Sequence, residues 1–134
     1  AGGYGSGYCY IDGLAFDKNG NLWMTSSEVN HAVLVLDKAG AWHRLDIEQL
    51  RGVYTINDIL ITSTNDKWIY VPRNTPKLVM IPNSESLDEV SSYEFTTLID
   101  TDGKELTPSN YTCVTEDKDG YIWDWYESGG RIFH

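Results

Sequence analysis

The sequence offers few side chains for nucleophilic or acid–base chemistry. Its three histidines are His31, His43 and the terminal His134. There is no Gly-x-Ser-x-Gly motif, and no spacing pairs a cysteine with a histidine. A catalytic triad needs partners within hydrogen-bond reach of each other, and no pattern here brings such residues together. We therefore predict no catalytic residue, and we interpret the histidines as exposed loop or half-buried strand residues.

Two acidic segments, Asp100–Gly103 and Asp117–Gly120, resemble the start of a calcium loop. An EF-hand loop requires ligands at alternating positions and a bidentate glutamate at its twelfth place. Glu105 comes too early after the first segment, and Glu127 falls at the eleventh place counted from Asp117. Both segments are therefore predicted to be hairpin turns, and the sequence predicts no metal and no cofactor.

The candidate binding residues are Arg73, Trp125 and Tyr126. Arg73 lies in a proline-rich segment, which restricts the backbone around it. Aromatic residues and arginine are the side chains most often found at binding hot spots. Trp125 and Tyr126 are adjacent, so on a strand they point to opposite faces. The long acidic segment Ser84–Ser92 has two interpretations, a binding loop or a solvated insertion.

Composition excludes several classes of partner. The chain has 134 residues, and 10 basic against 20 acidic residues give a net charge of −10. Such a surface repels phosphate backbones and anionic lipids, so we expect no nucleic-acid binding. No apolar stretch approaches the roughly 20 residues of a membrane-spanning helix, so we expect no direct membrane insertion. Cys9 and Cys113 form no disulfide framework, and whether they pair stays open.

The elements that would position these side chains follow from an internal repeat. Leu14–Trp23 and Val114–Trp123 place aspartate, lysine, glycine, an aliphatic residue and tryptophan at matching offsets, and Ile59–Trp68 is a weaker copy. The three tryptophans, Trp23, Trp68 and Trp123, are 45 and 55 residues apart. This spacing is typical of the four-stranded blade of a β-propeller. The high aromatic share, 13%, also suits strands.

The turns of the repeat have their own signature. Asp-x-x-Gly occurs four times, for example at Asp17–Gly20 and Asp37–Gly40. Aspartate at the first position of a hairpin turn accepts backbone hydrogen bonds, and glycine at the fourth supplies a positive φ. We assign structural roles to the repeated positions: Asp17, Gly20, Trp23, Trp68, Asp117, Gly120 and Trp123. The tryptophans are predicted to pack between blades rather than to stack on sugars.

These patterns predict an all-β fold, a partial β-propeller of four-stranded antiparallel blades. Residues 1–134 form one domain of about 2.75 blades, at 13–46, 56–98 and 112–134, the last truncated. A partial ring leaves two blade faces without a neighbour. We therefore expect the chain to self-associate through these open faces.

The pattern Asp-x-x-Gly-x-aliphatic-Trp, followed by a hairpin, resembles the two-component regulator propeller repeat. Nearly the whole chain, and in particular Asn57–Thr62 with Lys67–Ile69 and Trp42, is similar to the propellers of the PorZ family of type IX secretion components. The resemblance implies an extracytoplasmic module, in the periplasm or on the surface of a Gram-negative bacterium. It implies binding of a glycan or protein partner without catalysis, either in secretion or as the sensor domain of a two-component receptor.

An enzyme is the alternative. Propeller lyases of the virginiamycin B lyase family have similar Asp-x-x-Gly-x-x-Trp repeats, and lactonases share the propeller architecture. The resemblance implies that such enzymes hold a divalent metal at the axis with side chains from several blades. Few candidate ligands are visible in this sequence, so we favour the binding module.

Overall fold

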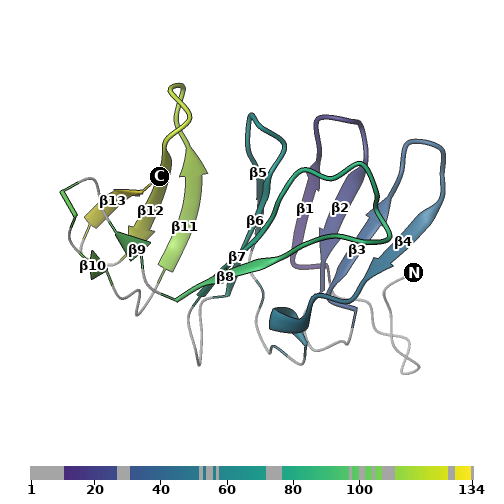
Figure 1. The fold of residues 1–134 in the computed structure, drawn as a ribbon, viewed down its shortest axis with the longest axis horizontal. Coiled ribbons are helices and arrows are strands. Elements are labelled where there is room, and N and C mark those ends of the chain that lie inside the picture. The colour runs from purple at the N-terminus through teal and green to yellow at the C-terminus, as the bar shows by residue number, and fades with distance from the viewer. Residues whose placement is uncertain are drawn as a thin grey trace.

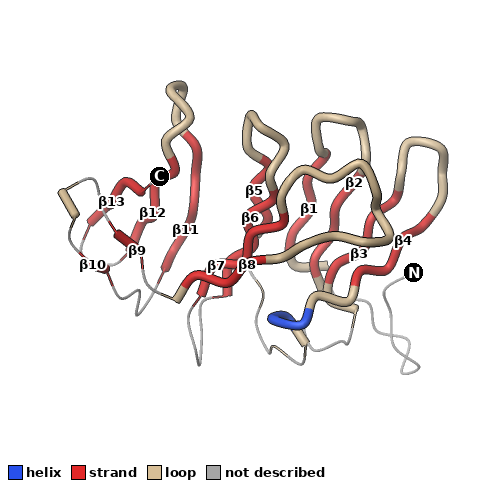
Figure 2. The backbone as a smooth tube through the Cα atoms, in the orientation of Figure 1, coloured by secondary structure: helices blue, strands red, loops and turns tan. Residues whose placement is uncertain are grey.

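The fold was analysed in a computed structural model. It describes the following residues: 11–26, 31–51, 53, 56, 58–71, 77–96, 98–99, 102–103, 105–106, 111–126 and 129–133. For 98–99, 105–106, 111–114, 124–126 and 129–133 only the backbone is described. Apart from one short 3₁₀ helix, the regular elements that the structure describes are all strands (Figure 2).

The strands form antiparallel sheets that follow one another along the chain. The first sheet has the order β1 (Gly13–Phe16), β2 (Leu22–Thr25), β3 (Val33–Leu36), β4 (Trp42–Leu45). After the short 3₁₀ helix η1 (Glu48–Leu50), the second sheet has the order β5 (Ile59–Ile61), β6 (Lys67–Val71), β7 (Lys77–Ile81), β8 (Tyr93–Phe95). The hairpin β9 (Leu98–Ile99) and β10 (Glu105–Leu106) precedes the third sheet, β11 (Tyr111–Glu116), β12 (Ile122–Tyr126), β13 (Gly129–Phe133).

The sheets stand side by side, with the tips of their first hairpins at the same end (Figure 1). β1 contacts β5, and β6 contacts β11, so successive sheets meet near their first strands. Within the described residues the segments around 59–71 and 111–126 contain strands and no helix. The predicted fold class, four-stranded antiparallel sheets in an all-β chain, is confirmed.

The main core lies between the first and second sheets. Alternate residues of β2, β3 and β4 face the second sheet, and those of β5, β6 and β7 face the first. All of these side chains are buried, among them Trp23, Val33, Val35, Leu45, Ile59, Ile69, Val71, Val79 and Ile81. Burial of large aliphatic side chains contributes roughly 1.5–3 kcal/mol each to folding. This core holds the two sheets in a fixed relation.

A smaller core joins the second sheet to the third. Tyr70 and Leu78 are buried there with Ile122, and Leu60 packs against them. The rings of Trp68 and Phe95 contact each other at a centroid distance of 5.5 Å. The second sheet is therefore covered on both faces.

One glycine is required by this stacking. A Cβ atom at Gly13 would lie 2.7 Å from Thr25 Oγ1, 3.0 Å from the amide nitrogen of Ile59 and 3.1 Å from Asp58 Cα. Two of these atoms belong to the backbone leading into β5, which cannot move aside easily. Gly13 therefore permits the close approach of β1 and β5. In the part of the chain that the structure describes, no helix has the length and apolar character to cross a membrane.

Candidate functional site: the rim of the first sheet

The turn between β1 and β2 is organised by one carboxylate. Asp17 Oδ1 accepts hydrogen bonds from the backbone N–H groups of Asn19 (2.8 Å) and Asn21 (2.9 Å). Its Oδ2 accepts a bond from Trp23 Nε1 at 2.8 Å. Gly20 adopts a φ of +86°, and its N–H donates to the Asp17 carbonyl at 3.2 Å. The aspartate thus joins the turn to an indole in the core.

The same carboxylate remains ionised although it is buried. Burial alone would raise the pKa of Asp17, but the bonds from Trp23, Asn21 and Asn19 together lower it. Asp117 repeats the arrangement, because its Oδ2 accepts a bond from Trp123 Nε1 at 2.9 Å. The hydrogen bond from Trp123 is the main reason why the pKa of Asp117 is lowered.

The weaker copy of the repeat builds the same turn with other residues. Thr62 takes the place of the aspartate, and its Oγ1 accepts a bond from the Asp66 N–H at 3.0 Å. Asn65 takes the place of the glycine with a φ of 65°, and its N–H donates to the Thr62 carbonyl at 2.9 Å. Asparagine tolerates this left-handed conformation better than other residues with a side chain. The hairpin is therefore kept although its sequence signature is lost.

Side chains at these tips also join neighbouring sheets. Asn65 Oδ1 accepts a bond from the Lys18 N–H of the preceding tip at 2.8 Å. Glu116 accepts bonds from the Ser63 N–H (2.8 Å) and Ser63 Oγ (2.7 Å). In both cases the N–H donor belongs to the residue that comes directly after the first residue of a turn. The β1–β2 tip and the β5–β6 tip are thus each bonded to the next sheet along the chain.

A lysine is buried where the first two sheets meet. Lys67 is 2% exposed, and its Nζ lies 4.7 Å from the centroid of the Trp23 ring. Desolvation lowers the pKa of Lys67, and the charges of Asp17 and Asp66 partly offset this effect. The ammonium group is therefore stabilised by the indole face and two nearby carboxylates rather than by water.

The turn between β3 and β4 has the same Asp-x-x-Gly pattern as the turn between β1 and β2. Six residues after its aspartate stands His43, where the β1–β2 hairpin has Trp23. Asp37 Oδ1 accepts bonds from the N–H groups of Ala39 (3.0 Å) and Ala41 (2.8 Å). Its Oδ2 lies 2.8 Å from His43 Nε2, and His43 Nδ1 lies 2.8 Å from Asp88 Oδ1. An imidazole can donate at both nitrogens only when it is protonated. This ring therefore connects the turn to Asp88 best as an imidazolium.

The two carboxylates raise the pKa of His43, with the hydrogen bond to Asp37 as the larger cause and that to Asp88 as the next. In return, the bond from His43 is the main reason why the pKa of Asp37 is lowered. The His43 side chain is 17% exposed and that of Asp88 is 80% exposed. The contact between His43 and the two carboxylates is therefore charged and partly exposed to solvent. The edge of the first sheet at which it lies is here named the rim.

Asp88 belongs to the segment 82–92, here named the bridging loop. It leaves β7, reaches across to the first sheet beside β4, and returns to β8 (Figure 1). Leu87 and Val90 pack against the main core, and Ser92 Oγ donates to Gln49 Oε1 at 2.9 Å. The interpretation of this segment as a solvated insertion is therefore wrong, because its apolar side chains are used to cover the core.

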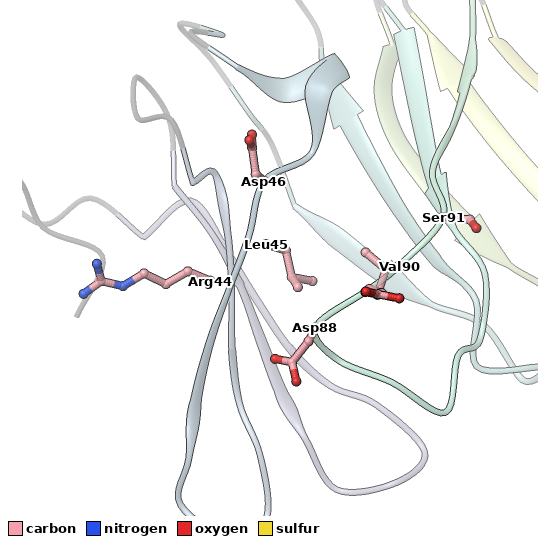
Figure 3. A pocket seen from close by; sticks show the side chains of 7 residues that line it. Arg44, Leu45, Asp46, Asp88, Val90 and Ser91 are labelled. Carbon is pink, nitrogen blue, oxygen red and sulfur yellow. The ribbon is translucent and has the colours of Figure 1, made fainter.

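A groove lies between the bridging loop and the end of β4 (Figure 3). Its volume is about 560 Å³, and it is lined by Arg44, Leu45, Asp46, Asp88, Glu89, Val90 and Ser91. Figure 3 shows Leu45 and Val90 facing each other, whereas the Arg44 side chain points away from the loop. Asp46 is paired with Arg51 at 2.7 Å, which lowers the pKa of Asp46. The groove is thus lined by acidic residues around a small apolar floor.

Of the predicted binding residues, the structure describes only the backbone of two. Arg73 lies outside the described residues. Trp125 and Tyr126 occupy β12, where their backbones are opposite Gly130 and Gly129 of β13. Their binding role stays a prediction.

The other flagged residues are placed only in part. Cys113 lies on β11 opposite Trp125, and Cys9 lies outside the described residues. Of the turn at 100–103, Gly103 has the expected positive φ of +81°. No group of three or more histidine, cysteine, aspartate or glutamate residues able to hold a metal occurs among the described residues.

The contact between Asp37 and His43 could be predicted from the sequence. His43 follows Asp37 at the same offset as Trp23 follows Asp17, which marks it as a ring donor to the turn. Its second partner, Asp88, is 45 residues further along the chain and belongs to no repeat. Only the course of the bridging loop brings it to the imidazole.

The arrangement of sheets was compared with solved structures. The chain is similar to PorZ of Porphyromonas gingivalis with a TM-score of 0.83 and 17% identity, over 95% of this chain and 18% of PorZ. It is also similar to virginiamycin B lyase of Staphylococcus aureus (TM-score 0.60, 15% identity, 92% of this chain and 41% of the lyase). A streptogramin B lyase matches with a TM-score of 0.59 and 20% identity, over 85% and 33% of the two chains. The fold is a partial β-propeller.

At these identities the likeness concerns the fold alone. No protein-family model and no curated protein matches the chain. The resemblance to PorZ propellers is thus confirmed at the level of the fold, and membership of the two-component regulator repeat family stays a prediction. The chain spans less than a fifth of PorZ and less than half of either lyase. The stacked sheets are called blades from here on.

Proposed function

We propose that this chain is part of a non-catalytic, extracytoplasmic propeller module that acts as a scaffold and binds a glycan or a protein partner. The observation that carries the proposal is the use of the repeat's polar side chains. Asp17, Lys67 and His43 are all engaged in holding turns, blades or the bridging loop. Because these side chains have structural roles, we infer that they do not form a reactive centre. The surface at the rim of the first sheet then remains for binding a partner.

The likeness to PorZ supports an extracytoplasmic location. PorZ is described as an essential bacterial surface component of the type IX secretion system. This chain shares its fold across 95% of its own length. We propose a surface or periplasmic role on this basis, either in secretion or in ligand sensing by a receptor.

The groove beside the bridging loop is the proposed contact area. Glu89 offers carboxylate oxygens, and Leu45 offers an apolar floor. Carboxylates accept hydrogen bonds from sugar hydroxyls and pair with basic peptide groups, so both ligand classes are suited to it. The net charge of −10 further favours a neutral glycan or a basic partner.

The test measures binding of the purified chain to an array of defined glycans and to a panel of basic peptides. We expect Glu89→Ala to weaken binding at least fivefold, and Glu85→Ala to leave it unchanged. Both glutamates are exposed residues of the bridging loop, but only Glu89 lines the groove. Equal binding by the two variants, or no binding to either panel, would contradict the groove as the contact area.

A second candidate function is an enzyme of the propeller lyase class. Two lyases match the fold, with TM-scores of 0.60 and 0.59. The decisive measurement is the divalent-metal content of the full-length protein, together with consumption of virginiamycin B followed by chromatography. We expect neither a stoichiometric metal nor turnover. A bound metal accompanied by turnover would replace the scaffold proposal.

A further inference from the structure

The bridging loop is attached to the rest of the molecule mainly at its two ends. One end is held because the Asn83 N–H donates to Asp66 Oδ1 at 2.9 Å, and the other is held by the bond from Ser92 to η1 described above. Between these ends, the contact of His43 with Asp88 is the one hydrogen bond that joins the loop to another element, within the part of the chain that the structure describes. The middle of the loop therefore depends on a single polar contact.

The same middle section is ordered by its own serines. Ser84 Oγ accepts a bond from the Ser86 N–H at 3.3 Å. Ser86 Oγ accepts bonds from the N–H groups of Asp88 (3.2 Å) and Glu89 (3.3 Å). Such serine turns favour one local backbone conformation. Asp88 thus belongs to a small ordered unit, so a change in its contact with the first sheet affects the position of the whole unit.

Apolar contacts hold this unit only in part. Leu87 and Val90 pack against the main core, but both side chains are only half-buried. Val90 faces Leu45 across the groove (Figure 3). A segment with few buried apolar contacts opens locally at a small cost in free energy. The contact between His43 and Asp88 is therefore able to decide whether the loop stays closed.

Two carboxylates control the charge of His43. Asp37 reaches it from the turn of its own hairpin and Asp88 reaches it from the bridging loop, and both raise its pKa, Asp37 more strongly. The paired strand β3 brings no charge, because it is aliphatic and Val35 lies opposite His43. The other charged residues of the adjoining turn, strand and loop have no part in this pKa shift: Lys38, Arg44, Asp46, Glu85 and Glu89.

Loss of the proton must break one of the two contacts. A neutral imidazole carries one N–H, so its other nitrogen would present a lone pair to a carboxylate oxygen 2.8 Å away. Asp37 is fixed in place, since its Oδ1 also accepts backbone N–H bonds from Ala39 and Ala41. The Asp88 side chain is 80% exposed, and its carboxylate has no second hydrogen bond among the described residues. Asp88 is therefore the partner that leaves.

We propose that the bridging loop is a proton-controlled strap, which is closed on the first sheet while His43 is an imidazolium and opens between its two fixed ends when His43 loses the proton. Opening would remove Asp88 and Val90 from the groove and leave Leu45 uncovered. Access to the groove would then depend on pH. This consequence rests on the proposed function, whereas the movement of the strap requires no ligand.

Hydrogen–deuterium exchange of the 134-residue chain, measured by mass spectrometry from pH 5 to 9, tests the movement. The exchange rate of the segment 84–91 is divided at each pH by the rate of an unfolded chain. We expect this ratio to rise at least fivefold with pH, while the ratio for β3 stays constant. Nitrogen NMR of the histidine rings should give the same midpoint for loss of the His43 proton. A ratio that is independent of pH, or that rises with a different midpoint, would overturn the proposal.

Two substitutions are expected to act in opposite directions. In Asp88→Asn, the amide can accept a bond from an imidazolium and can donate one to the lone pair of a neutral ring, so the strap should stay closed at every pH. In His43→Gln no cation is present, so the strap should be open at every pH. Glu85→Gln is the matched control, since Glu85 is an exposed carboxylate of the same loop with no part in the His43 pKa shift.

Circular dichroism establishes that the three variants are folded. A pH response of Asp88→Asn equal to that of the unaltered chain would contradict the strap. Because opening is measured without a ligand, the result is separate from the binding test above. A strap that opens as described in a chain that binds neither glycans nor peptides would contradict the proposed function alone, and binding in the groove by a chain whose strap does not open would contradict this proposal alone.

Discussion

In the first blade, the β1–β2 hairpin and the β3–β4 hairpin use the same type of turn for different purposes. In both, one aspartate oxygen accepts two backbone N–H bonds and the other accepts a ring N–H six residues later. The ring is the indole of Trp23 in the first hairpin and the imidazole of His43 in the second. Trp23 is 1% exposed in the core, whereas the His43 side chain is 17% exposed at the rim.

This difference teaches how one repeat position acquires two roles. An indole has a single N–H that does not titrate near neutral pH, so the Asp17–Trp23 bond does not depend on pH in that range. An imidazole gains a second N–H when protonated, so His43 can join its own turn and the bridging loop at the same time. The first hairpin therefore supports the fold, and the second connects a surface segment in a way that depends on pH.

The largest effect is expected from removing the carboxylate of the first hairpin. Asp17→Ala would leave the buried Trp23 N–H without its acceptor and would remove a charge near Lys67. We expect a loss of about 3 kcal/mol in the free energy of unfolding, measured with urea. Asp37→Ala is the control, and we expect its loss to be less than half as large because its turn is exposed. Equal losses would show that the two hairpins do not differ as described.

A smaller effect, equal in the two hairpins, is expected from the turn glycines. Gly20 and Gly40 have φ values of +86° and +91°, and an added Cβ at either meets no atom within 3.4 Å. Gly20→Ala and Gly40→Ala should therefore each cost about 1–2 kcal/mol, from backbone strain alone. The comparison of urea midpoints would reveal any difference. A much larger loss for Gly20→Ala would mean that the turns themselves differ, and not only their ring residues.

The smallest effect is expected from titration of His43. Its folded-state pKa is raised, so its stabilising contribution is complete below the unfolded value of about 6.5 and is lost as the pH rises through the folded value. Asp37 has a lowered pKa, so its contribution is present above about 3.8 and is lost as the pH falls through its folded value. The connection should be strongest between these limits.

The urea midpoint and the rate of proteolysis of the bridging loop, both measured from pH 5 to 9, would follow this change. His43→Gln should remove most of the pH dependence in this range, and Asp88→Asn should reduce it because one carboxylate partner remains. Glu85→Gln, in the same loop, is the control. An unchanged pH profile in His43→Gln would exclude the imidazole as the titrating group.

Sequence reasoning predicted the strands and turns well where the determinants are local. The Asp17 and Asp117 hairpins combine a turn and a ring donor within seven residues, so the pattern is visible in the residues themselves. The hairpin at Thr62 and Asn65 was read only as a weak copy, because a threonine and an asparagine supply the same bonds with different atoms. The interpretation of the bridging loop as a solvated insertion is wrong, because Leu87 and Val90 pack against the core. In the sequence these two residues stand among polar and acidic ones, which dominate the pattern.

The sequence by itself determined the elements of this protein: where strands turn, which ring nitrogen each aspartate receives, and that the unit repeats. These depend on hydrogen bonds between residues a few positions apart. The tertiary structure alone decided that Lys67 is buried over Trp23, that Asp88 reaches His43, and that the first and second sheets share one core. Such contacts join residues some 45 positions apart, and their formation depends on how whole sheets stack rather than on any local pattern.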